Sequence, residues 1–257
     1  DGTTTDRPRP VPVTGISDVS AVSMGGLGTT CAISYGDLYC WGYGIGPPGQ
    51  NVPLPTKVSG LSRVSAVSVG LTICAISDGD AYCWRNNASG QVGNGSTGSV
   101  DVPTRVAGLS DVTAVSTSHT TSCAIAGGSA YCWGNNREGQ IGDGTTETRQ
   151  APVQVGNLSG VSAISTDWGT TCAVSDDRAF CWGDDDRSQL GSSGGSVKIP
   201  REVSTLTDVT SISTGNGTSC AMAAASVYCW GFNNDGQVGD GSSGDGANRT
   251  TPTKLTI

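Results

Sequence analysis

The chain has 257 residues, a formal net charge of −8 and an isoelectric point of about 4.4. Glycine is abundant, with 39 copies, only 14% of the residues are charged, and no stretch is long and apolar enough to be a transmembrane helix. An acidic chain without a basic face is a poor partner for nucleic acid or for an anionic membrane. We therefore expect no nucleic-acid partner and no membrane insertion, and the length suits one large all-β domain.

One pattern occurs five times: a cysteine, eight residues, a second cysteine and a tryptophan. The first cysteines stand at positions 31, 74, 123, 172 and 220, so the period is between 43 and 49 residues. A period in this range is typical of a repeat architecture. The pairs account for all ten cysteines of the chain: Cys31 and Cys40, Cys74 and Cys83, Cys123 and Cys132, Cys172 and Cys181, and Cys220 and Cys229.

The residues midway between the paired cysteines favour two-residue hairpin turns. If the two cysteines face each other, the turns centre on Tyr35-Gly36, Asp78-Gly79, Gly127-Gly128, Asp176-Asp177 and Ala224-Ala225. Asp-Gly is a strong signal for a type I′ turn, whereas Ala-Ala is a poor one. Counted outward from the turn, the cysteines fall on a non-hydrogen-bonded pair, where Cα atoms lie ~4.5 Å apart and a disulfide can form.

We therefore predict one disulfide in each hairpin. Zinc ligation and reduced core thiols are the alternatives, but zinc usually requires two thiolates two to four residues apart, and this chain lacks that spacing. Five disulfides indicate an oxidising compartment, either extracellular or periplasmic. The chain begins with Asp1 and carries no signal peptide, so we interpret it as a mature secreted protein or a domain of one.

Three further phrases accompany each hairpin. A β-branched phrase such as Val112-Thr-Ala-Val-Ser116 precedes it, a loop rich in glycine and asparagine follows the tryptophan, and a proline-led strand such as Pro103-Thr-Arg-Val106 follows the loop. Four strands per unit predict a five-bladed β-propeller of antiparallel blades, in which neighbouring units bury each other. We expect one domain over residues 1–257, with repeats at about 10–54, 55–102, 103–151, 152–200 and 201–257.

The proline-led phrase also occurs at both ends of the chain, as Pro10–Ile16 and Pro252–Ile257. The sequence thus offers six outer strands for five blades. We expect one of the two terminal copies to complete the last blade and latch the ring, and the sequence does not indicate which copy is spare.

The loop phrase Trp-Gly-x-Asn-x-x-Gly-Gln-x-Gly-x-Gly, present at 133–144 and 230–241, resembles the repeat of the regulator-of-chromosome-condensation family. The resemblance covers essentially the whole chain and implies a β-propeller, which in this family usually has seven blades. This chain departs in having five units and two cysteines per hairpin, and in having a recurring histidine before the hairpin only once, at His119. Five units imply either a five-bladed ring or part of a larger one, and no family site residue carries over.

Positions that differ between units are free to serve binding. In the turn before each hairpin the units carry Leu27, Leu71, His119, Trp168 and Asn216. In a propeller these turns lie near the central axis, so we expect the five side chains to surround one mouth of the channel and bind a ligand. The alternative is that they fill the mouth and pack on one another. Trp168 is the strongest candidate, because the tryptophans that end the five hairpins are expected to pack between blades.

A run of carboxylates, Asp184, Asp185 and Asp186, could hold Ca²⁺, although solvated loop residues are the simpler interpretation and no EF-hand spacing is present. We expect no other cofactor. Catalysis is poorly supported, because the one histidine, His119, would have to serve any nucleophile and the cysteines are paired. A carboxylate pair such as Glu138 and Asp167 is conceivable for glycoside hydrolysis, but the sequence does not place the two together.

We expect a secreted, non-catalytic binding protein, in the first place a lectin-like propeller that binds carbohydrate or a surface, with two alternatives. A carbohydrate- or surface-binding propeller, similar in blade count and repeat length to tachylectin-type lectins, would have several equivalent sites between blades. A propeller that binds or inhibits an extracellular protein would use one asymmetric rim, which suits the variable turn residues better. A structural module of a larger extracellular protein would have neither kind of site.

Overall fold

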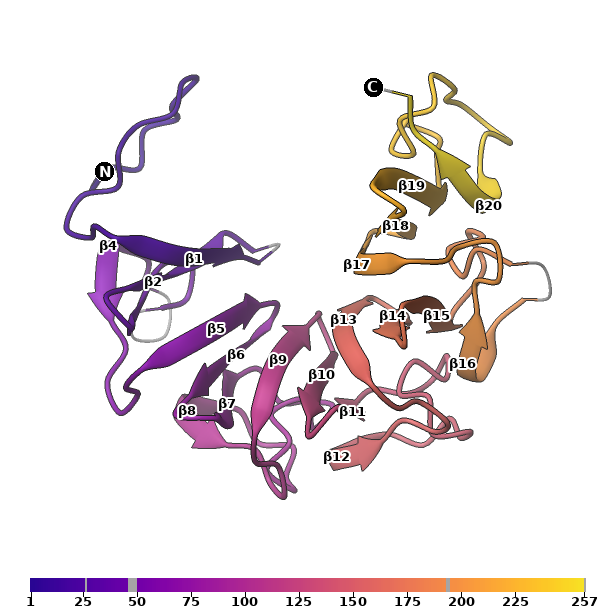
Figure 1. The fold of residues 1–257 in the computed structure, drawn as a ribbon. Coiled ribbons are helices and arrows are strands. Elements are labelled where there is room, and N and C mark those ends of the chain that lie inside the picture. Colours follow the sequence, from indigo (N-terminus) through magenta and orange to yellow (C-terminus); the bar gives the residue numbers. More distant parts are fainter. Residues whose placement is uncertain (26, 46–49, 193–194, 257) are drawn as a thin grey trace.

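The computed structural model describes residues 1–25, 27–45, 50–192 and 195–256, and in these ranges the fold is all-β. Twenty strands form five four-stranded antiparallel sheets, each ordered as its strands occur in the chain. The predicted five-bladed propeller of four-stranded blades is confirmed (Figure 1). Within the described ranges, no helix has the length and apolar character needed to cross a bilayer.

Each blade contains an inner strand, the two strands of the cysteine hairpin, and an outer strand. Blade 1 comprises β1 (Val19–Met24), β2 (Thr29–Ser34), β3 (Asp37–Gly42) and β4 (Val52–Lys57). Blade 2 comprises β5 (Val64–Val69), β6 (Thr72–Ser77), β7 (Asp80–Arg85) and β8 (Val100–Arg105). Blade 3 comprises β9 (Val112–Thr117), β10 (Thr121–Ala126), β11 (Ser129–Gly134) and β12 (Arg149–Gln154). Blade 4 comprises β13 (Val161–Asp167), β14 (Thr170–Ser175), β15 (Arg178–Gly183) and β16 (Val197–Glu202). Blade 5 comprises β17 (Val209–Gly215), β18 (Thr218–Ala223), β19 (Ser226–Gly231) and β20 (Arg249–Lys254).

The hairpins have the predicted register. In every blade the two cysteines face each other, their Cα atoms lie 4.1–4.2 Å apart, and a disulfide joins them. Both turn residues have positive φ in all five hairpins, including Ala224 at 46° and Ala225 at 57°. The disulfides are therefore confirmed, and blade 5 adopts the same turn as the others although alanine disfavours it.

The apolar core consists of layers between consecutive blades. The four clusters of buried residues each combine side chains of two neighbouring sheets. The tryptophan that ends each hairpin belongs to these layers: Trp133, Trp182 and Trp230 are fully buried, and Trp84 is 4% exposed. The expectation that the repeated tryptophans pack between blades is thus confirmed for blades 2 to 5.

The buried tryptophan also forms a hydrogen bond between blades. Trp133 Nε1 donates to the carbonyl oxygen of Gln91 in the preceding blade at 2.8 Å, and Trp182 Nε1 donates to that of Gln140 at 2.9 Å. Trp230 makes the same bond to Gln189 at 2.8 Å. A hydroxyl one residue before the first cysteine donates to the same carbonyl groups, from Ser122, Thr171 and Ser219 at 2.8–2.9 Å.

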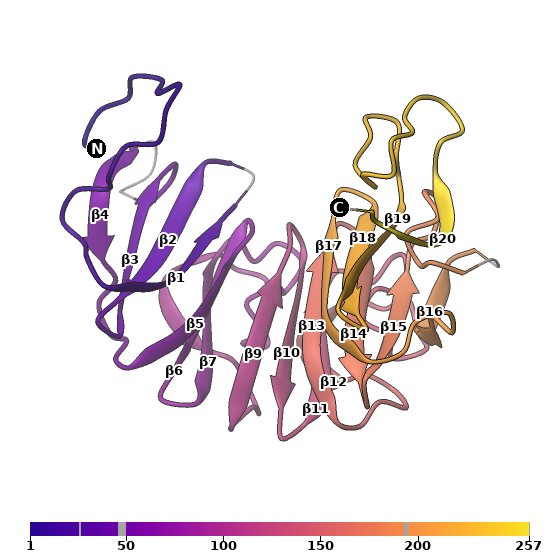
Figure 2. The same cartoon turned by 45° about the horizontal axis from the view of Figure 1, so that its top comes forward.

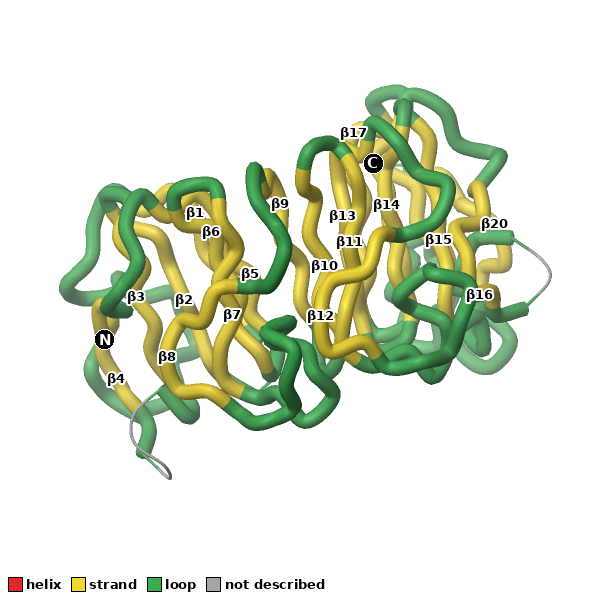
Figure 3. Tube along the Cα trace, turned by 90° about the horizontal axis from the view of Figure 1, so that it is seen from below, coloured by secondary structure: helices red, strands yellow, loops and turns green. Residues whose placement is uncertain are grey.

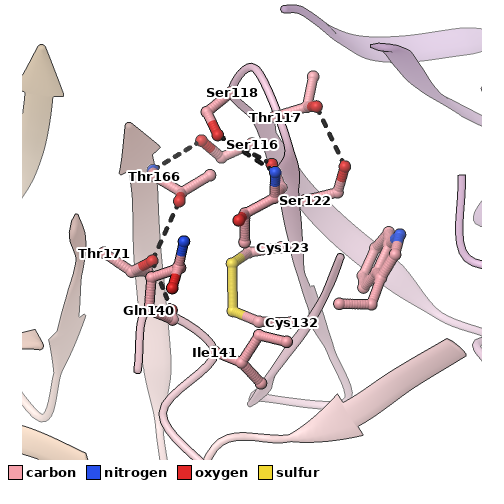
Figure 4. The surroundings of a disulfide bond; sticks show 12 residues. Ser116, Thr117, Ser118, Ser122, Cys123, Cys132, Gln140, Ile141, Thr166 and Thr171 are labelled. Carbon is pink, nitrogen blue, oxygen red and sulfur yellow. Dashed lines mark hydrogen bonds between the residues drawn. A yellow bond between two sulfur atoms is a disulfide. The ribbon is translucent and has the colours of Figure 1, made fainter. Parts of the chain in front are cut away.

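The inner strands are linked in a second way. A serine hydroxyl on one inner strand accepts the backbone N–H of the next blade at 3.0 Å, as between Ser116 and Thr166 (Figure 4). The same contact occurs at all four junctions, where the other pairs are Ser23 with Val69, Ser68 with Thr117, and Ser165 with Thr214. The recurring Val-Ser/Thr-Ala/Ser-Val/Ile-Ser phrase therefore serves the junction between blades.

The blades form an arc, with the inner strands on its concave side and the outer strands on its convex side (Figure 1). Figure 1 also shows an opening between blade 1 and blade 5, so the two ends of the arc do not close the ring. The expectation that a terminal strand latches the ring is therefore wrong, because β20 pairs with β19 of its own blade. The residues that face this opening are exposed: Val19 is 47% and Met24 72% exposed, whereas their counterparts in blade 2, Val64 and Val69, are 4% and 6% exposed. At the other end Met222 is 47% exposed.

The pairing of the outer strands shows which of the two terminal proline-led phrases is left over. β20 pairs with β19 and completes blade 5, while residues 10–16 form no strand and Val11 and Val13 are 45% and 40% exposed. The last residue of the C-terminal phrase, Ile257, lies outside the described residues. The prolines stand inside the outer strands rather than at their start, which an edge strand tolerates because one of its sides forms no ladder.

Two of the loops that follow a tryptophan hold a partly buried ion pair. In blade 3 the carboxylate of Asp143 accepts bonds from the backbone and hydroxyl of Thr145 and pairs with Arg149 at 2.7 Å. Burial alone would raise the pKa of Asp143, but these partners hold it below its ordinary value. In blade 5 the bonds from Ser242, together with Arg249, hold the pKa of Asp240 well below its ordinary value.

Replacing Trp182 tests the hydrogen bond between blades. Trp182→Phe keeps most of the ring but removes the donor, so we expect a loss of about 1–2 kcal/mol of unfolding free energy. Trp182→Ala also leaves a cavity and should cost about 3–5 kcal/mol. The matched control is Trp41→Phe, because Trp41 is only half-buried and has no blade before it. Urea unfolding with the disulfides intact measures the unfolding free energy of each variant. Equal losses in Trp182→Phe and Trp41→Phe would show that the hydrogen bond between blades does not contribute.

The ion pairs predict how stability depends on pH. A carboxyl whose folded pKa lies below its unfolded value of about 3.9 contributes stability above that pH and loses it as the pH falls further. We therefore expect the thermal midpoint of the native chain to fall steeply below about pH 4, and to fall less steeply in the Asp143→Asn/Asp240→Asn variant. Calorimetry from pH 2.5 to about 7 checks this, and identical slopes for both proteins would rule out the contribution.

Candidate functional site

The five turns that join the inner strands to the hairpins lie along one edge of the arc, which we call the rim. The inner strands run in the same direction in every blade, so their connections to the hairpins share one rim (Figure 2). Seen edge-on, the strands form the middle of the molecule and the loops gather along its two rims (Figure 3). The predicted ligand-binding residues Leu27, Leu71, His119, Trp168 and Asn216 all stand in these turns or at their ends.

Three of the five side chains belong to consecutive blades that meet. The rings of His119 and Trp168 are stacked, with centroids 4.4 Å apart and planes tilted by 35°. Trp168 and Asn216 both line one pocket at the junction of blades 4 and 5. Leu71 is linked to the next turn only through its backbone, whose N–H donates to the carbonyl of Ser118 at 3.3 Å, and Leu27 is 55% exposed and does not line this pocket.

The pocket has a volume of about 360 Å³. It is lined by Asp167, Trp168, Gly169, Thr170, Asp184, Asp186, Arg187, Gln189, Asn216 and Gly217. Trp168 is 63% exposed, whereas Trp133, Trp182 and Trp230, which pack between blades, are fully buried. The junction therefore presents a large aromatic face to solvent beside a polar hollow.

A repeated contact explains why the loop after the tryptophan reaches this rim. Thr170 Oγ1 donates to the carbonyl of Asp184 at 3.0 Å, and Asp184 N–H donates to the carbonyl of Gly169 at 2.9 Å. The equivalent threonines of blades 3 and 5, Thr121 and Thr218, bind the equivalent loops at 2.8–2.9 Å. The turn and the loop of one blade thus form one surface, and in blade 4 that surface is acidic.

The carboxylates of the pocket are positioned by hydrogen bonds within it. Asp184 Oδ2 accepts from Gln189 Nε2 at 3.0 Å and Asp184 Oδ1 accepts from the backbone N–H of Asp186 at 3.0 Å. Asp167 Oδ2 accepts the backbone N–H of Asn216 in the next blade. Among the ion pairs within the described residues, none involves Asp167, Asp184 or Asp186.

Arg187 supplies the one positive side chain among the pocket residues described, and it is engaged with blade 5. Its Nη1 donates to the carbonyl oxygen of Asn216 at 3.2 Å, and its guanidinium lies 4.6 Å from the centre of the Phe232 ring. Gly217 permits this approach, because a Cβ there would stand 2.5 Å from Arg187 Cδ. The guanidinium therefore forms a wall of the pocket and pairs with none of its carboxylates.

The acidic run does not gather into a metal site. Asp185 points inward, where its Oδ1 accepts the N–H of Leu190 at 3.0 Å and its Oδ2 lies 3.4 Å from Arg201 Nη2. Burial raises the pKa of this carboxyl. No group of three or more histidine, cysteine or acidic residues within the described ranges is arranged to hold a metal ion. Calcium therefore finds no support in the arrangement of Asp184, Asp185 and Asp186.

Sequence reasoning missed the contributions of Arg187 and Gln189 to this rim. The chain gave one signal for the downstream loop: where blades 2 and 3 have Asn-Asn after the tryptophan and its next residue, blade 4 has Asp184-Asp185. The loop of blade 3 also approaches the turn of blade 4, because a Cβ at Gly169 would lie 3.4 Å from Glu138 Cγ and 3.2 Å from Asp184 Cβ.

Comparison with known proteins assigns the family. The sequence profile of the regulator of chromosome condensation (RCC1) repeat matches residues 78–125, 127–174, 176–222 and 225–257. These segments cover more than half of the chain, which therefore belongs to the RCC1 repeat family, as the loop phrase had indicated. No curated protein matches the chain by sequence search.

Solved structures of RCC1-type propellers share the fold. Human WBSCR16 superposes with a TM-score of 0.82 and 22% identity, over 97% of this chain and 69% of that one. Yeast RCC1 (Prp20), crystallised with Kap60, gives 0.78 and 20% identity over 90% of this chain and 60% of that one. Prp20p from Saccharomyces cerevisiae gives 0.77 and 20%, over 90% and 62%. The chain thus spans between 60% and 69% of the length of these propellers, and at such identities the likeness concerns the fold.

The exposure of Trp168 can be measured directly. Replacement by leucine, the residue that blades 1 and 2 carry in this turn, should leave the fold intact because the side chain is 63% exposed. We expect Trp168→Leu to remove the most red-shifted part of the tryptophan emission and most of its quenching by acrylamide. Quenching that is unchanged in Trp168→Leu would show that Trp168 is buried in solution.

Proposed function

We propose that the chain is a secreted, non-catalytic binding propeller that captures a protein partner through the rim formed by His119, Trp168 and Asn216. The observation that carries the proposal is the pocket at the junction of blades 4 and 5, where Trp168 stands exposed beside polar side chains. Exposed aromatic residues beside a hollow are common anchors of protein interfaces.

The asymmetry of the rim supports one partner rather than several equivalent ligands. The five turns carry a leucine, a second leucine, a histidine, a tryptophan and an asparagine, so no two neighbouring junctions offer the same surface. The residues that do repeat are occupied by the frame: Asn87, Asn136 and Asn233 are fully buried, and their side chains accept the N–H five residues later at 2.9–3.0 Å.

The family is consistent with this proposal. Yeast RCC1 (Prp20) has been crystallised bound to Kap60, and Prp20p binds Gsp1p and histones. Those partners belong to those proteins, which are longer than the part that this chain matches. What we carry over is that a propeller of this kind binds other proteins. The five disulfides favour an extracellular or periplasmic setting for it.

A carbohydrate ligand is the second candidate, because an exposed tryptophan beside carboxylate and amide groups also suits a sugar ring. The two functions differ in stoichiometry. A lectin with one site per repeat would bind several glycans per chain, whereas the asymmetric rim would bind one partner per chain. The buried state of the repeated tryptophans and asparagines favours the protein partner.

Site-specific photo-crosslinking tests the proposal. A photoreactive phenylalanine derivative replaces either Trp168 or Val102, a 64% exposed residue of the outer strand β8, and the oxidised chain is offered to native extracellular protein. We expect one protein to be crosslinked from position 168 and not from 102, with 1:1 stoichiometry after purification. Trp168→Leu should weaken its binding at least tenfold, because interface tryptophans often contribute 2 kcal/mol or more, roughly.

Two results would contradict the proposal. Equal crosslinking from positions 168 and 102 would mean that the rim is not the binding surface. Several equivalent glycan sites per chain, measured by calorimetry after a glycan array, would establish the lectin function in its place. Val102→Ala is the matched control for Trp168→Leu, since it shortens an equally exposed side chain away from the rim.

A further inference from the structure

We propose that the pocket at the junction of blades 4 and 5 binds a cationic group, a guanidinium or ammonium, between the face of Trp168 and the carboxylates of Asp167, Asp184 and Asp186. The inference rests on the proposed function and names the chemistry of the partner's anchoring side chain. It stands on the pocket, on the exposed ring within it, and on the charge of its walls.

The walls carry an excess of negative charge. Three carboxylates line the pocket, and Arg187 is the single cation among the lining residues described. Arg187 does not neutralise them, because its guanidinium donates to the carbonyl of Asn216 and lies over Phe232. A cation that enters the pocket would therefore meet carboxylates without an ion-pair partner, in a hollow where solvent screens charge less than on an open surface.

The aromatic face adds a second attraction. A cation within about 6 Å of a tryptophan ring is attracted by the π-system, with a gain from about 0.5 to 2 kcal/mol as the site becomes less solvated. The exposed ring of Trp168 also contacts the ring of His119, with centroids 4.4 Å apart. Beside the pocket, the chain itself places the guanidinium of its lining residue Arg187 over the ring of Phe232, a contact of the same kind.

The junction of blades 3 and 4 lacks these features at the equivalent positions. Blade 3 has His119 where blade 4 has Trp168, and Asn135 and Arg137 where blade 4 has Asp184 and Asp186. The junction of blades 3 and 4 thus presents a positive side chain in place of a carboxylate. The chemistry of the pocket is therefore specific to blade 4, as expected of one binding site on a repeated frame and not of the frame itself.

The pocket is of a size for one side chain. Its volume of about 360 Å³ lies near the lower end of the range of about 300–1,000 Å³ for ligand pockets, which suits the end of an arginine or lysine. The same group on a protruding loop would insert while the loop itself contacts His119 and Asn216 on the rim.

The test uses N-acetyl-arginine amide as the probe and N-acetyl-citrulline amide as its neutral isostere. Binding is followed through the indole N–H signal of Trp168, assigned with Trp168→Leu, as the probe rises to ~100 mM. For an isolated side-chain contact we expect a dissociation constant of roughly 1–30 mM. We expect saturation by the arginine probe in this range, weakening in salt, and at least tenfold weaker binding of citrulline.

The contribution of the carboxylates is tested by neutralising two of them in Asp184→Asn/Asp186→Asn. Asparagine occurs at the position of Asp184 in blades 2 and 3, so the loop should fold, and we expect at least a tenfold loss of affinity for the arginine probe. The matched control, Asp101→Asn/Glu147→Gln, removes two exposed carboxylates outside the pocket and should bind as the native chain does.

Any of three results would overturn the inference: equal binding of arginine and citrulline probes, saturable binding of acetate or phosphate at this junction, or no saturation up to ~100 mM. These results leave the proposed function intact if a partner still crosslinks from position 168. Conversely, a saturating arginine probe together with equal crosslinking from positions 168 and 102 would uphold the cation site and refute the protein-binding rim.

Discussion

The fold depends on one contact that recurs at the junctions of blades 2 and 3, 3 and 4, and 4 and 5. A buried tryptophan donates its indole N–H to the carbonyl of a glutamine in the previous blade, and a neighbouring hydroxyl donates to the same oxygen. The indole ring fits only because glycine stands beside it. A Cβ at Gly93, Gly142 or Gly191 would lie 2.6–2.7 Å from Nε1. The disulfides are local to one hairpin each, so non-covalent contacts at the junctions, and not disulfides, pack the blades against one another.

The repeated residues serve the contacts between blades, which we call the frame. The turns on the rim are therefore free to vary. Ligand-binding side chains on propellers and other rigid scaffolds are commonly found in such connections. Here the variation yields one junction with an exposed tryptophan and three carboxylates, beside junctions that lack both. The two ends of the arc show the frame without a neighbour: Trp41 is half-buried, and Gln237 is exposed where its counterparts Gln91 and Gln140 are buried.

The fold could be predicted from the sequence because its signals are local and repeated. The cysteine spacing fixes the hairpin register, and Asp78-Gly79 and its relatives fix the turn. The opening of the arc could not be predicted, since it depends on the angle between blades, which side-chain packing across each junction sets. The sequence singled out Trp168, but the pocket joins residues some 50 positions apart, such as Asp167 and Asn216, through contacts between blades.

Hydrogen exchange of the six indole N–H groups tests most directly the division between frame and binding surface. With the native, oxidised chain in D₂O, the account predicts slow exchange for Trp133, Trp182 and Trp230, whose N–H groups are buried and bonded to the preceding blade. Trp168, which is 63% exposed, should exchange within the dead time. Comparable protection of Trp168 and the three frame tryptophans would contradict the account, because the rim would then belong to the packed frame.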